Sequence, residues 1–411
     1  MKNYLFTKIT CIVVLVIMAP ICCYVLYHSL GNLRENQDQI FVQDDIFLNA
    51  RAGIDYLNAQ YNENIPLKMK FIEANGFFQN AFNRHYIEDV AIENSIVKDN
   101  YGQLHFTGFW QEENVFDQKT LPGLIKQITT LNQALKEKNL PLLYIAAPEK
   151  IIAGSTQFPI LINNYANAKV DSFLKALQDT EIPTLDLRQV ITEPAANKAD
   201  LFYKTDHHWQ SQTAFDAAFV IADYINNNFG TNIDSANYYR DINNYAVEDY
   251  PAFFVGSQGR RVGKYYAGVD DFHLIYPKFA TDYTVTYFSG REKSRTGDYR
   301  SALIFDDFLK DDNIYTNRYA AYLGGDHPLM TITNHKQDKY KILIIKDSFT
   351  APAASFLSTA VHEIKLVDLR HYNDSLTDLA LAYQPDLTII LYSAGGLNDT
   401  MFSFDKQANT R

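Results

Sequence analysis

Cysteine is scarce in this chain, and all of it lies near the N-terminus. The 411 residues include 3 cysteines, Cys11, Cys22 and Cys23. The rest of the chain therefore has no disulfide, no thiol nucleophile and no cysteine metal site. Such a domain must be stabilised by its hydrophobic core alone, and a chain that is 47% hydrophobic and 14% aromatic can supply one.

Basic residues are also in the minority. The 37 lysines and arginines face 48 aspartates and glutamates, which gives a formal net charge of −11. A chain with this balance has no general electrostatic attraction to nucleic acid or to an anionic membrane surface, so we expect no nucleic-acid partner. An acidic ligand would need a local basic patch, for which Arg260 and Arg261 are candidates.

Long hydrophobic runs are missing except at residues 9–27. That run is long enough to cross a bilayer and longer than the apolar part of most cleaved signal peptides, so it predicts an uncleaved signal anchor. Lys2 and Lys8 precede the run, and acidic residues prevail after it. The positive-inside rule then predicts a single-pass protein of the cytoplasmic membrane, with residues 1–8 in the cytosol and the remainder outside the cytoplasm.

The rest of the chain alternates between helical and strand patterns. Helical spacing in residues 28–90 predicts a juxtamembrane stalk, and residues 91–411 predict one α/β domain with a parallel sheet between helices. Residues 226–300 are rich in Tyr, Asn, Gly and Asp, break the alternation and predict an insertion. Residues 92–110 predict a strand, a turn and a strand. Short buried strands are expected at residues 142–147, 183–187, 302–305, 342–345, 364–367 and 387–391.

Ser348 follows one of these strands and precedes a helical segment. A turn of this kind holds a hydroxyl at the carboxyl edge of a sheet, and the helix N-terminus offers N–H groups to an oxyanion. Ser348 is therefore a candidate nucleophile. The same segment is equally compatible with a serine that only caps the helix.

Asp206 and His208 form the second candidate group. Alternate side chains share a face in an extended segment, so these two can point the same way while His207 points elsewhere. A carboxylate that orients an imidazole, which in turn activates Ser348, would complete an acyl-transfer triad. Two alternatives remain open: a helix cap with packed histidines, or a metal site. Further metal ligands would come from Asp306, Asp307, Asp311 and Asp312.

Two glycine-rich loops are candidates for the oxyanion donors. Asn398 follows the strand at residues 387–391, and an amide at a strand end is a suitable donor. Gly325 lies in the second loop and could bring a backbone N–H to the site. Both loops are also compatible with plain surface turns.

Four blocks of the sequence together resemble the DHHW proteins, which belong with the AlgX/AlgJ-like relatives of the SGNH hydrolases. They are residues 203–209 (YKTDHHW), 256–263 (GSQGRRVG), 266–272 (YAGVDDF) and 345–349 (IKDSF). The resemblance extends over roughly residues 90–400.

The resemblance implies an SGNH-hydrolase-like α/β/α sandwich with a parallel sheet, circularly rearranged so that the Asp-x-His segment precedes the serine. It implies Ser348 as nucleophile, His208 as general base and Asp206 as its orienter. The family members work outside the cytoplasmic membrane as polysaccharide O-acetyltransferases or acetylesterases, beside a multi-span acyl-exporting membrane protein. One departure is Lys346, because the wider group has glycine before the aspartate that precedes the serine.

We therefore expect a membrane-anchored extracytoplasmic serine acyltransferase or esterase that needs no metal and no other cofactor. Its substrate would be a cell-surface or exported polysaccharide or cell-wall glycan, and a multi-span membrane-bound O-acyltransferase would be its partner. The residues expected to bind the glycan are Arg260, Arg261, Tyr265 and Tyr266. The alternatives are a non-catalytic glycan-binding or scaffold protein of cell-envelope polymer assembly, and a metal-dependent phosphoester hydrolase.

Overall fold

The computed structural model describes residues 23–24, 26–32, 34, 53, 67–110, 120–158, 163–195 and 197–405. By its contacts the chain divides into two units, residues 1–75 and residues 76–411. Apart from residues 23, 24, 26 and 27, the predicted anchor at residues 9–27 lies outside the described residues, as does much of the predicted stalk, and both stay predictions. Among the residues that are described, no helix combines the length and the hydrophobicity needed to cross a bilayer.

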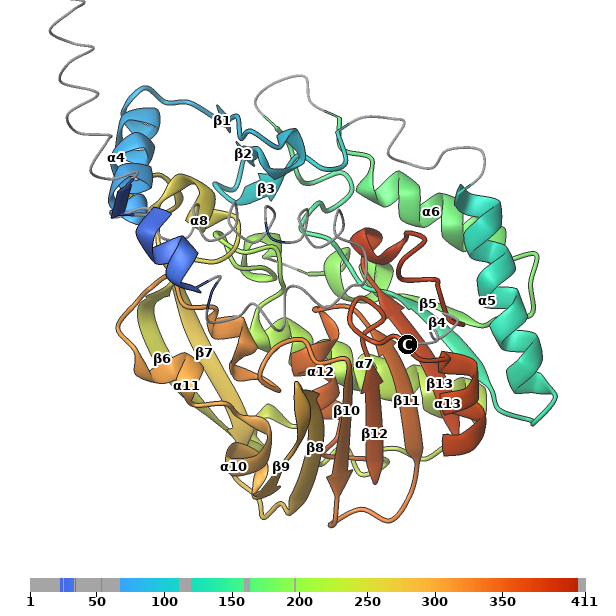
Figure 1. Cartoon of the computed structure of the whole chain (residues 1–411). Coiled ribbons are helices and arrows are strands. Elements are labelled where there is room, and N and C mark those ends of the chain that lie inside the picture. The colour runs from blue at the N-terminus through green and yellow to red at the C-terminus, as the bar shows by residue number, and fades with distance from the viewer. Residues whose placement is uncertain are drawn as a thin grey trace, which may run out of the picture. The chain divides into compact units, whose positions relative to one another are not determined.

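The larger unit is built on an eight-stranded mixed sheet (Figure 1). The first five strands of the spatial order run parallel, as predicted, whereas the last three are antiparallel to their neighbours. The prediction of a purely parallel sheet is therefore wrong at one edge. In spatial order the strands are β5 (Thr184–Asp186), β4 (Leu142–Ala146), β13 (Leu387–Tyr392), β11 (Lys341–Lys346), β12 (Glu363–Val367), β10 (Leu329–Asn334), β8 (Tyr283–Ser289) and β9 (Arg291–Gly297).

Helices cover both faces of this sheet (Figure 1). Side chains of a strand alternate between the faces, so Ile342 and Ile344 join one hydrophobic core while Leu343 and Ile345 join the other. A three-layer α/β/α arrangement results, as the sequence predicts. The first core includes α7 (Ser211–Phe229) and α12 (Thr350–Leu357), and the second includes α5 (Thr120–Lys136), α6 (Ala166–Leu177) and α13 (Leu376–Tyr383).

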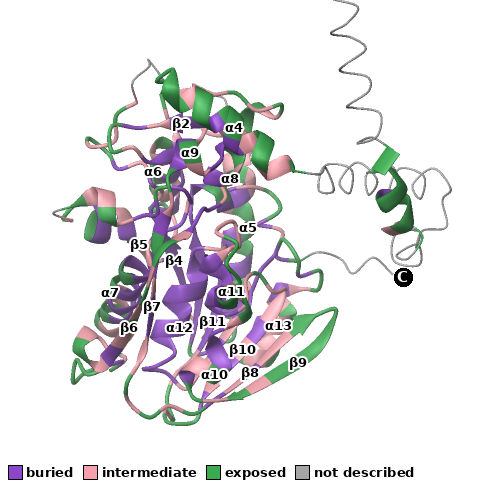
Figure 2. Cartoon of the chain, turned by 90° about the vertical axis from the view of Figure 1, so that its left-hand side faces the viewer, coloured by how far each residue is buried: buried purple, intermediate pink, exposed green. Residues whose placement is uncertain are grey.

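The predicted insertion at residues 226–300 has two parts. The first contains a separate antiparallel pair, β6 (Tyr245–Phe254) and β7 (Asp270–Pro277), with the short helices α8 (Gly259–Val262) and α9 (Lys264–Ala267) between them. The second is the β8–β9 hairpin, which extends the main sheet. A tight turn at Gly290 with a φ of 69° joins these strands, and such a turn makes them antiparallel. Figure 2 shows exposed residues along β9 at the edge and buried residues in β11.

The prediction of a strand at residues 302–305 is wrong. Residues Tyr299–Leu303 form the short helix α10, because the side chain of Asp298 accepts a hydrogen bond from the N–H of Ser301 at 2.8 Å and caps the first turn. An apolar run this short does not distinguish a buried helical turn from a strand.

The remaining elements include a three-stranded antiparallel sheet. Its strands are β1 (Tyr86–Ile87), β2 (Ile96–Lys98) and β3 (Leu104–Phe106), and the last two match the strands expected in residues 92–110. The other described helices are α4 (Lys68–Ala81), α11 (Asp307–Lys310) and the short turns η1 (Ile92–Asn94), η3 (Arg188–Thr192), η4 (Lys198–Asp200), η5 (Ile242–Asn244), η6 (Arg318–Ala321) and η7 (Ala394–Gly396).

Candidate active site

Ser348 lies in the turn that joins β11 to α12. The neighbouring Asp347 holds this turn, because its carboxylate accepts hydrogen bonds from the backbone N–H of Phe349 at 3.0 Å and of Ser393 at 2.7 Å. Ser393 follows β13, the strand beside β11. The two strand ends are thus tied together, and the serine lies at the carboxyl edge of the sheet.

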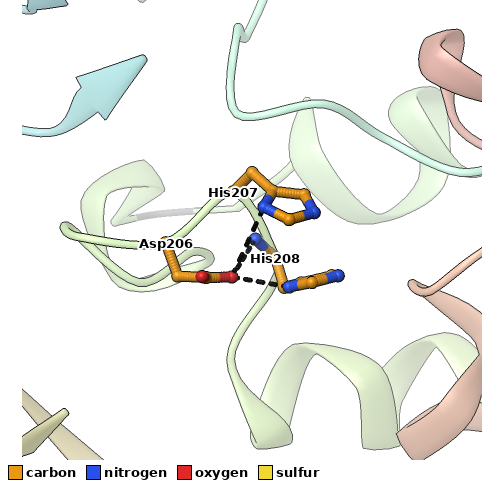
Figure 3. Close-up of side chains that lie close together, drawn as sticks. All are labelled: Asp206, His207 and His208. Atoms are coloured by element: carbon orange, nitrogen blue, oxygen red, sulfur yellow. Dashed lines mark hydrogen bonds and ion pairs between the residues drawn. The ribbon is translucent and has the colours of Figure 1, made fainter. Parts of the chain in front are cut away.

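The structure brings Asp206 and His208 to this serine. Nε2 of His208 lies 2.7 Å from Oγ of Ser348, and Nδ1 of His208 lies 2.5 Å from Oδ1 of Asp206. The same carboxylate oxygen accepts the backbone N–H of His208 at 3.0 Å. Figure 3 shows both of these contacts to Asp206. Three side chains from two distant segments therefore form one continuous chain of hydrogen bonds, the arrangement that activates a serine for acyl transfer.

A glycine makes the second half of the Asp206 site possible. The N–H of Ser257 donates to Oδ2 of Asp206 at 2.7 Å. A Cβ on the adjacent Gly256 would lie 2.2 Å from Cβ of Asp206, a distance that no side chain tolerates. The glycine at the start of the 256–263 block therefore lets the backbone approach the carboxylate.

The charge of Asp206 is stabilised in spite of its burial. Burial by itself raises the pKa of this carboxyl, but His208, His207 and the N–H of Ser257 together lower the pKa well below its usual value. Asp206 is therefore ionised at neutral pH and can stabilise a positive charge on His208 during proton transfer.

The plane of the His208 ring is set by Tyr319, which the sequence did not point to. The two rings are stacked, with centroids 3.9 Å apart and an interplanar angle of 9°. The hydroxyl of Tyr319 accepts a hydrogen bond from Nε1 of Trp209 at 3.0 Å and donates one to the carbonyl of Phe349 at 3.0 Å. Trp209, which belongs to the block at residues 203–209 (the DHHW block), thus supports the tyrosine that positions the imidazole.

His207 takes no part in this chain of hydrogen bonds. Its Nδ1 lies 2.8 Å from Oγ of Ser257 and 3.7 Å from Oδ1 of Asp206. Ligand atoms of Asp206, His207 and His208 do lie within 4.8 Å of one another, as a metal site would require. However, both ring nitrogens of His208 already have partners, in Asp206 and Ser348. Three of the acidic residues offered as further ligands are ion-paired elsewhere, Asp306 with Arg300, Asp307 with Lys310 and Asp311 with Arg318.

A cavity of about 510 Å³ opens at Ser348. Asn398, one of the two predicted oxyanion donors, lines it. One hydrogen of its amide is donated to the carbonyl of Gly395 at 2.8 Å, which leaves the second for a ligand. The described residues that line the cavity do not include the other predicted oxyanion donor, Gly325, which has a φ of 93° and precedes Asp326 in a loop next to β10.

The described cavity wall also lacks the four residues predicted to bind the glycan. Tyr266 is buried, donates a hydrogen bond to the carbonyl of Arg84 at 2.8 Å and packs under the ammonium group of Lys98. Arg261 pairs with Asp89, and Tyr265 is exposed. Nε of Arg260 is buried without a hydrogen-bond partner among the described residues. The 256–263 block supports Asp206 through Ser257 and contributes Gln258, not the predicted arginines, to the cavity wall.

Lys346, the departure from the family pattern, belongs to an ion-pair network beneath the serine turn. Its side chain is buried, pairs with Asp326 and lies 3.4 Å from a carboxylate oxygen of Asp368. Arg370 contacts the same two carboxylates, at 2.9 Å and 2.5 Å. The lysine therefore connects the end of β11 to the glycine-rich loop at Asp326.

Lys150 is a second residue that sequence reasoning missed. It is 3% exposed, and its ammonium group donates to the carbonyls of Leu104 at 2.7 Å, Lys204 at 3.1 Å and Asp206 at 2.9 Å, and to Oε1 of Gln258 at 3.0 Å. This one side chain thus joins β3, the DHHW block and the 256–263 block. Its only sequence signal is a lysine shortly after a buried strand.

We predict that Lys150→Met lowers the free energy of unfolding by about 3 kcal/mol, since it leaves buried acceptors without a donor. Urea denaturation measures this loss. Lys310→Met is the matched control, because that side chain is 70% exposed and should change stability by less than about 0.5 kcal/mol. Equal stabilities of the two variants would contradict the structural role of Lys150.

The same lysine predicts a pH dependence of stability. Burial lowers the pKa of Lys150 from 10.5 to about 8. Between these values the unfolded chain binds more protons than the folded chain, so the stability of the wild type relative to Lys150→Met should rise with pH. Denaturation series at pH 7 and pH 10 measure the difference.

Part of the chain is similar to a known protein family. Residues 106–246 match the family model described as SGNH hydrolase-like domain, acetyltransferase AlgX. This match confirms the predicted resemblance; it contains Asp206 and His208 and ends before Ser348. A comparison with curated proteins found no match.

Two solved structures share the fold. The structure of Bacillus cereus PatB1 with a sulfonyl adduct has a TM-score of 0.62 and 22% sequence identity, over 76% of this chain and 98% of that one. A DHHW family protein from Eubacterium siraeum has a TM-score of 0.54 and 16% identity, over 76% of this chain and 95% of that one. The fold is therefore shared over 76% of this chain and over nearly the whole length of each of the two solved structures.

Proposed function

We propose that this chain is a serine acyltransferase or esterase that transfers acetyl groups to the hydroxyls of a polysaccharide. The observation that carries the proposal is the chain of hydrogen bonds from Asp206 through His208 to Ser348, at the mouth of a cavity. The family-model match to an acetyltransferase domain supports acetyl as the transferred group.

The proposed reaction has two half-reactions. Nε2 of His208 takes the proton of the Ser348 hydroxyl while Oγ attacks the carbonyl of an acetyl ester or thioester donor. The donor's alcohol or thiol leaves with that proton, and an acetyl ester remains on the serine. A sugar hydroxyl then gives its proton to His208 and attacks this ester, and Ser348 leaves with the proton. The N–H of Ser348 and the amide of Asn398 would stabilise the oxyanion in both steps.

The proposed location is outside the cytoplasm, with residues 9–27 as the membrane anchor. Acetyl donors made in the cytosol cannot reach such a site unaided. We therefore propose a multi-span membrane-bound O-acyltransferase as the partner that delivers the acetyl group, and an exported polysaccharide or cell-wall glycan as the acceptor.

Covalent labelling with a fluorophosphonate tests this proposal, because only an activated serine reacts readily. We expect wild-type protein to be labelled at Ser348, and His208→Ala to react at least about 100-fold more slowly. Ser172→Ala, which removes a hydroxyl on α6 bonded to the carbonyl of Ala168, should be labelled like the wild type.

Two outcomes, one of the labelling and one of an elemental analysis of the purified protein, would redirect the assignment. Wild-type protein that stays unlabelled would favour the non-catalytic scaffold alternative. Stoichiometric manganese or zinc in the purified protein, lost on replacing His207, would favour the metal-dependent alternative.

A further inference from the structure

A second histidine lines the cavity that contains Ser348. His105, in β3, is 2% exposed and is one of the lining residues. Its Nε2 lies 2.8 Å from Oδ2 of Asp99. The other oxygen of Asp99 accepts the backbone N–H groups of Tyr101 at 2.8 Å and Gln103 at 2.9 Å. His105 and Asp99 are not part of the triad, but these hydrogen bonds hold them in place, and His105 lines the same cavity as Ser348.

The partner of Nε2 determines which nitrogen of His105 carries the proton. Burial lowers the pKa of His105, so the ring is neutral at physiological pH. A carboxylate oxygen only accepts, so Nε2 carries the hydrogen and Nδ1 holds a free lone pair. Among the described residues, the hydrogen bond of the His105 ring is the one from Nε2 to Asp99, and none involves Nδ1. The cavity wall thus contains an unused acceptor.

An unused donor lines the same cavity. Oδ1 of Asn164 accepts the N–H of Ala166 at 2.9 Å, whereas its Nδ2 is buried and has no hydrogen-bond partner within the described part of the chain. A buried amide hydrogen without a partner is costly and points to a missing ligand. Phe106 and Phe109 also line this cavity and offer apolar surface of the kind on which sugar rings pack.

The chemistry of this wall favours a neutral hydroxyl group. Hydroxyls both donate and accept, so the hydroxyls of one sugar can donate to Nδ1 of His105 and accept from Nδ2 of Asn164. A carboxylate or phosphate cannot donate to the imidazole. The charged side chains of the wall offer an anion no net attraction either, because the acidic Glu149 and Asp347 are matched by Lys150 and Arg370, whose charged groups already have partners.

We propose that His105 and Asn164 form an acceptor subsite, which binds hydroxyls of a neutral sugar while another hydroxyl of that sugar attacks the acetyl-serine. The inference rests on the proposed function and adds the substrate class to it. Its consequence is that the subsite directs the acetyl group to sugar instead of water and has no part in forming the acetyl-serine.

The test therefore separates the two half-reactions. Formation of the acetyl-enzyme is followed as the 4-nitrophenol burst from 4-nitrophenyl acetate. Transfer is measured by mass spectrometry on cellopentaose, xylopentaose and chitopentaose, with a pentagalacturonate as the acidic probe. We expect wild-type protein to acetylate at least one neutral probe faster than the acidic one.

His105→Gln is the first variant, since glutamine keeps an N–H near Asp99 but has no atom at the position of Nδ1. We expect an unchanged burst and a fall in transfer of about 10- to 100-fold, the range for losing a hydrogen bond to a buried polar group. His335→Gln is the matched control, because His335 is exposed and bonds to Thr284 on β8. It should leave both half-reactions unchanged.

Asp99→Asn is the second variant, and it leaves His105 in place. The N–H groups of Tyr101 and Gln103 require an oxygen at Oδ1, so the amide NH₂ must face Nε2 of His105. That contact reverses the tautomer, and Nδ1 then carries the hydrogen and no longer accepts one. We expect the same selective loss of transfer, with a melting temperature that shows the protein still folded.

Each outcome decides a different point. Transfer at the wild-type rate in both variants would overturn the subsite, and so would an equal loss of burst and transfer. Preference for the pentagalacturonate, or no transfer to any neutral probe by a wild-type protein that shows a burst, would overturn the neutral-sugar assignment. A wild-type protein without a burst would instead overturn the proposed function itself.

Discussion

Replacing Ser348 by alanine is expected to lower the rate of acetyl transfer by roughly 10⁵- to 10⁶-fold, the largest effect of any substitution in this chain. Oγ of Ser348 is the atom that carries the acetyl group between donor and sugar, and no other atom of the described site is hydrogen-bonded to Nε2 of His208 in its place. The loss is measured as the release of 4-nitrophenol from 4-nitrophenyl acetate and as acetyl transfer to an oligosaccharide.

This substitution should leave the fold intact. Oγ of Ser348 contacts Nε2 of His208 at 2.7 Å, and the turn itself is held by the carboxylate of Asp347. We expect the melting temperature of Ser348→Ala to stay within a few degrees of the wild type. Ser172→Ala is again the control and should keep full activity. Acetyl transfer by Ser348→Ala at a tenth of the wild-type rate or more would rule out a serine nucleophile.

Asp206→Asn is expected to lower acetyl transfer by about 10⁴-fold. Oδ1 of Asp206 accepts from Nδ1 and the backbone N–H of His208, and Oδ2 accepts from the N–H of Ser257. An amide can place an oxygen at only one of these positions, so its NH₂ must face a donor at the other. Either orientation disturbs the tautomer of His208 or the loop at Ser257. The substitution also removes the charge that stabilises the protonated imidazole.

Rates and stability together distinguish these effects. Asp216→Asn on α7 is the matched control, because Asp216 accepts one hydrogen bond from Gln212 at the surface and should tolerate the change. We expect fluorophosphonate labelling of Asp206→Asn to slow in parallel with transfer, while Asp216→Asn reacts like the wild type. Labelling of Asp206→Asn at the wild-type rate would show that Ser348 does not depend on an oriented His208.

Local patterns were sufficient for part of the fold. The apolar run before Ser348 correctly predicted a strand, β11, because only a central strand buries every side chain in succession. The spacing of Asp206 and His208 predicted that the two side chains meet, and they do. They meet through a bend at residues 204–208 and not through an extended segment, and His207, expected to point elsewhere, lies beside both. In contrast, the segment at residues 302–305 became the end of a helix through the cap at Asp298, a local competition that an apolar run does not reveal.

The residues around the triad could not be found from the sequence. Tyr319 stacks on His208, Lys150 joins three segments, and His105 pairs with Asp99. Each is an ordinary polar or aromatic residue in its own segment. The roles of Tyr319 and Lys150 come from partners far away in the chain, whereas that of His105 comes from the cavity it shares with Ser348, because its partner Asp99 is only 6 positions away. The antiparallel edge of the sheet is similar, because the hairpin of β8 and β9 joins β10 only through tertiary packing.

The sequence by itself determined the chemical inventory: Ser348 after a buried strand, Asp206 and His208 two positions apart, and no cysteine beyond residue 23 that could replace them. Only the tertiary structure decided that these parts meet. Ser348 and His208 are separated by 140 positions, and their 2.7 Å contact depends on the sheet that fixes the serine turn and on the glycine and lysine contacts that hold the DHHW block beside it. Local propensities act over a few residues, whereas a contact at this separation depends on the packing of the whole domain.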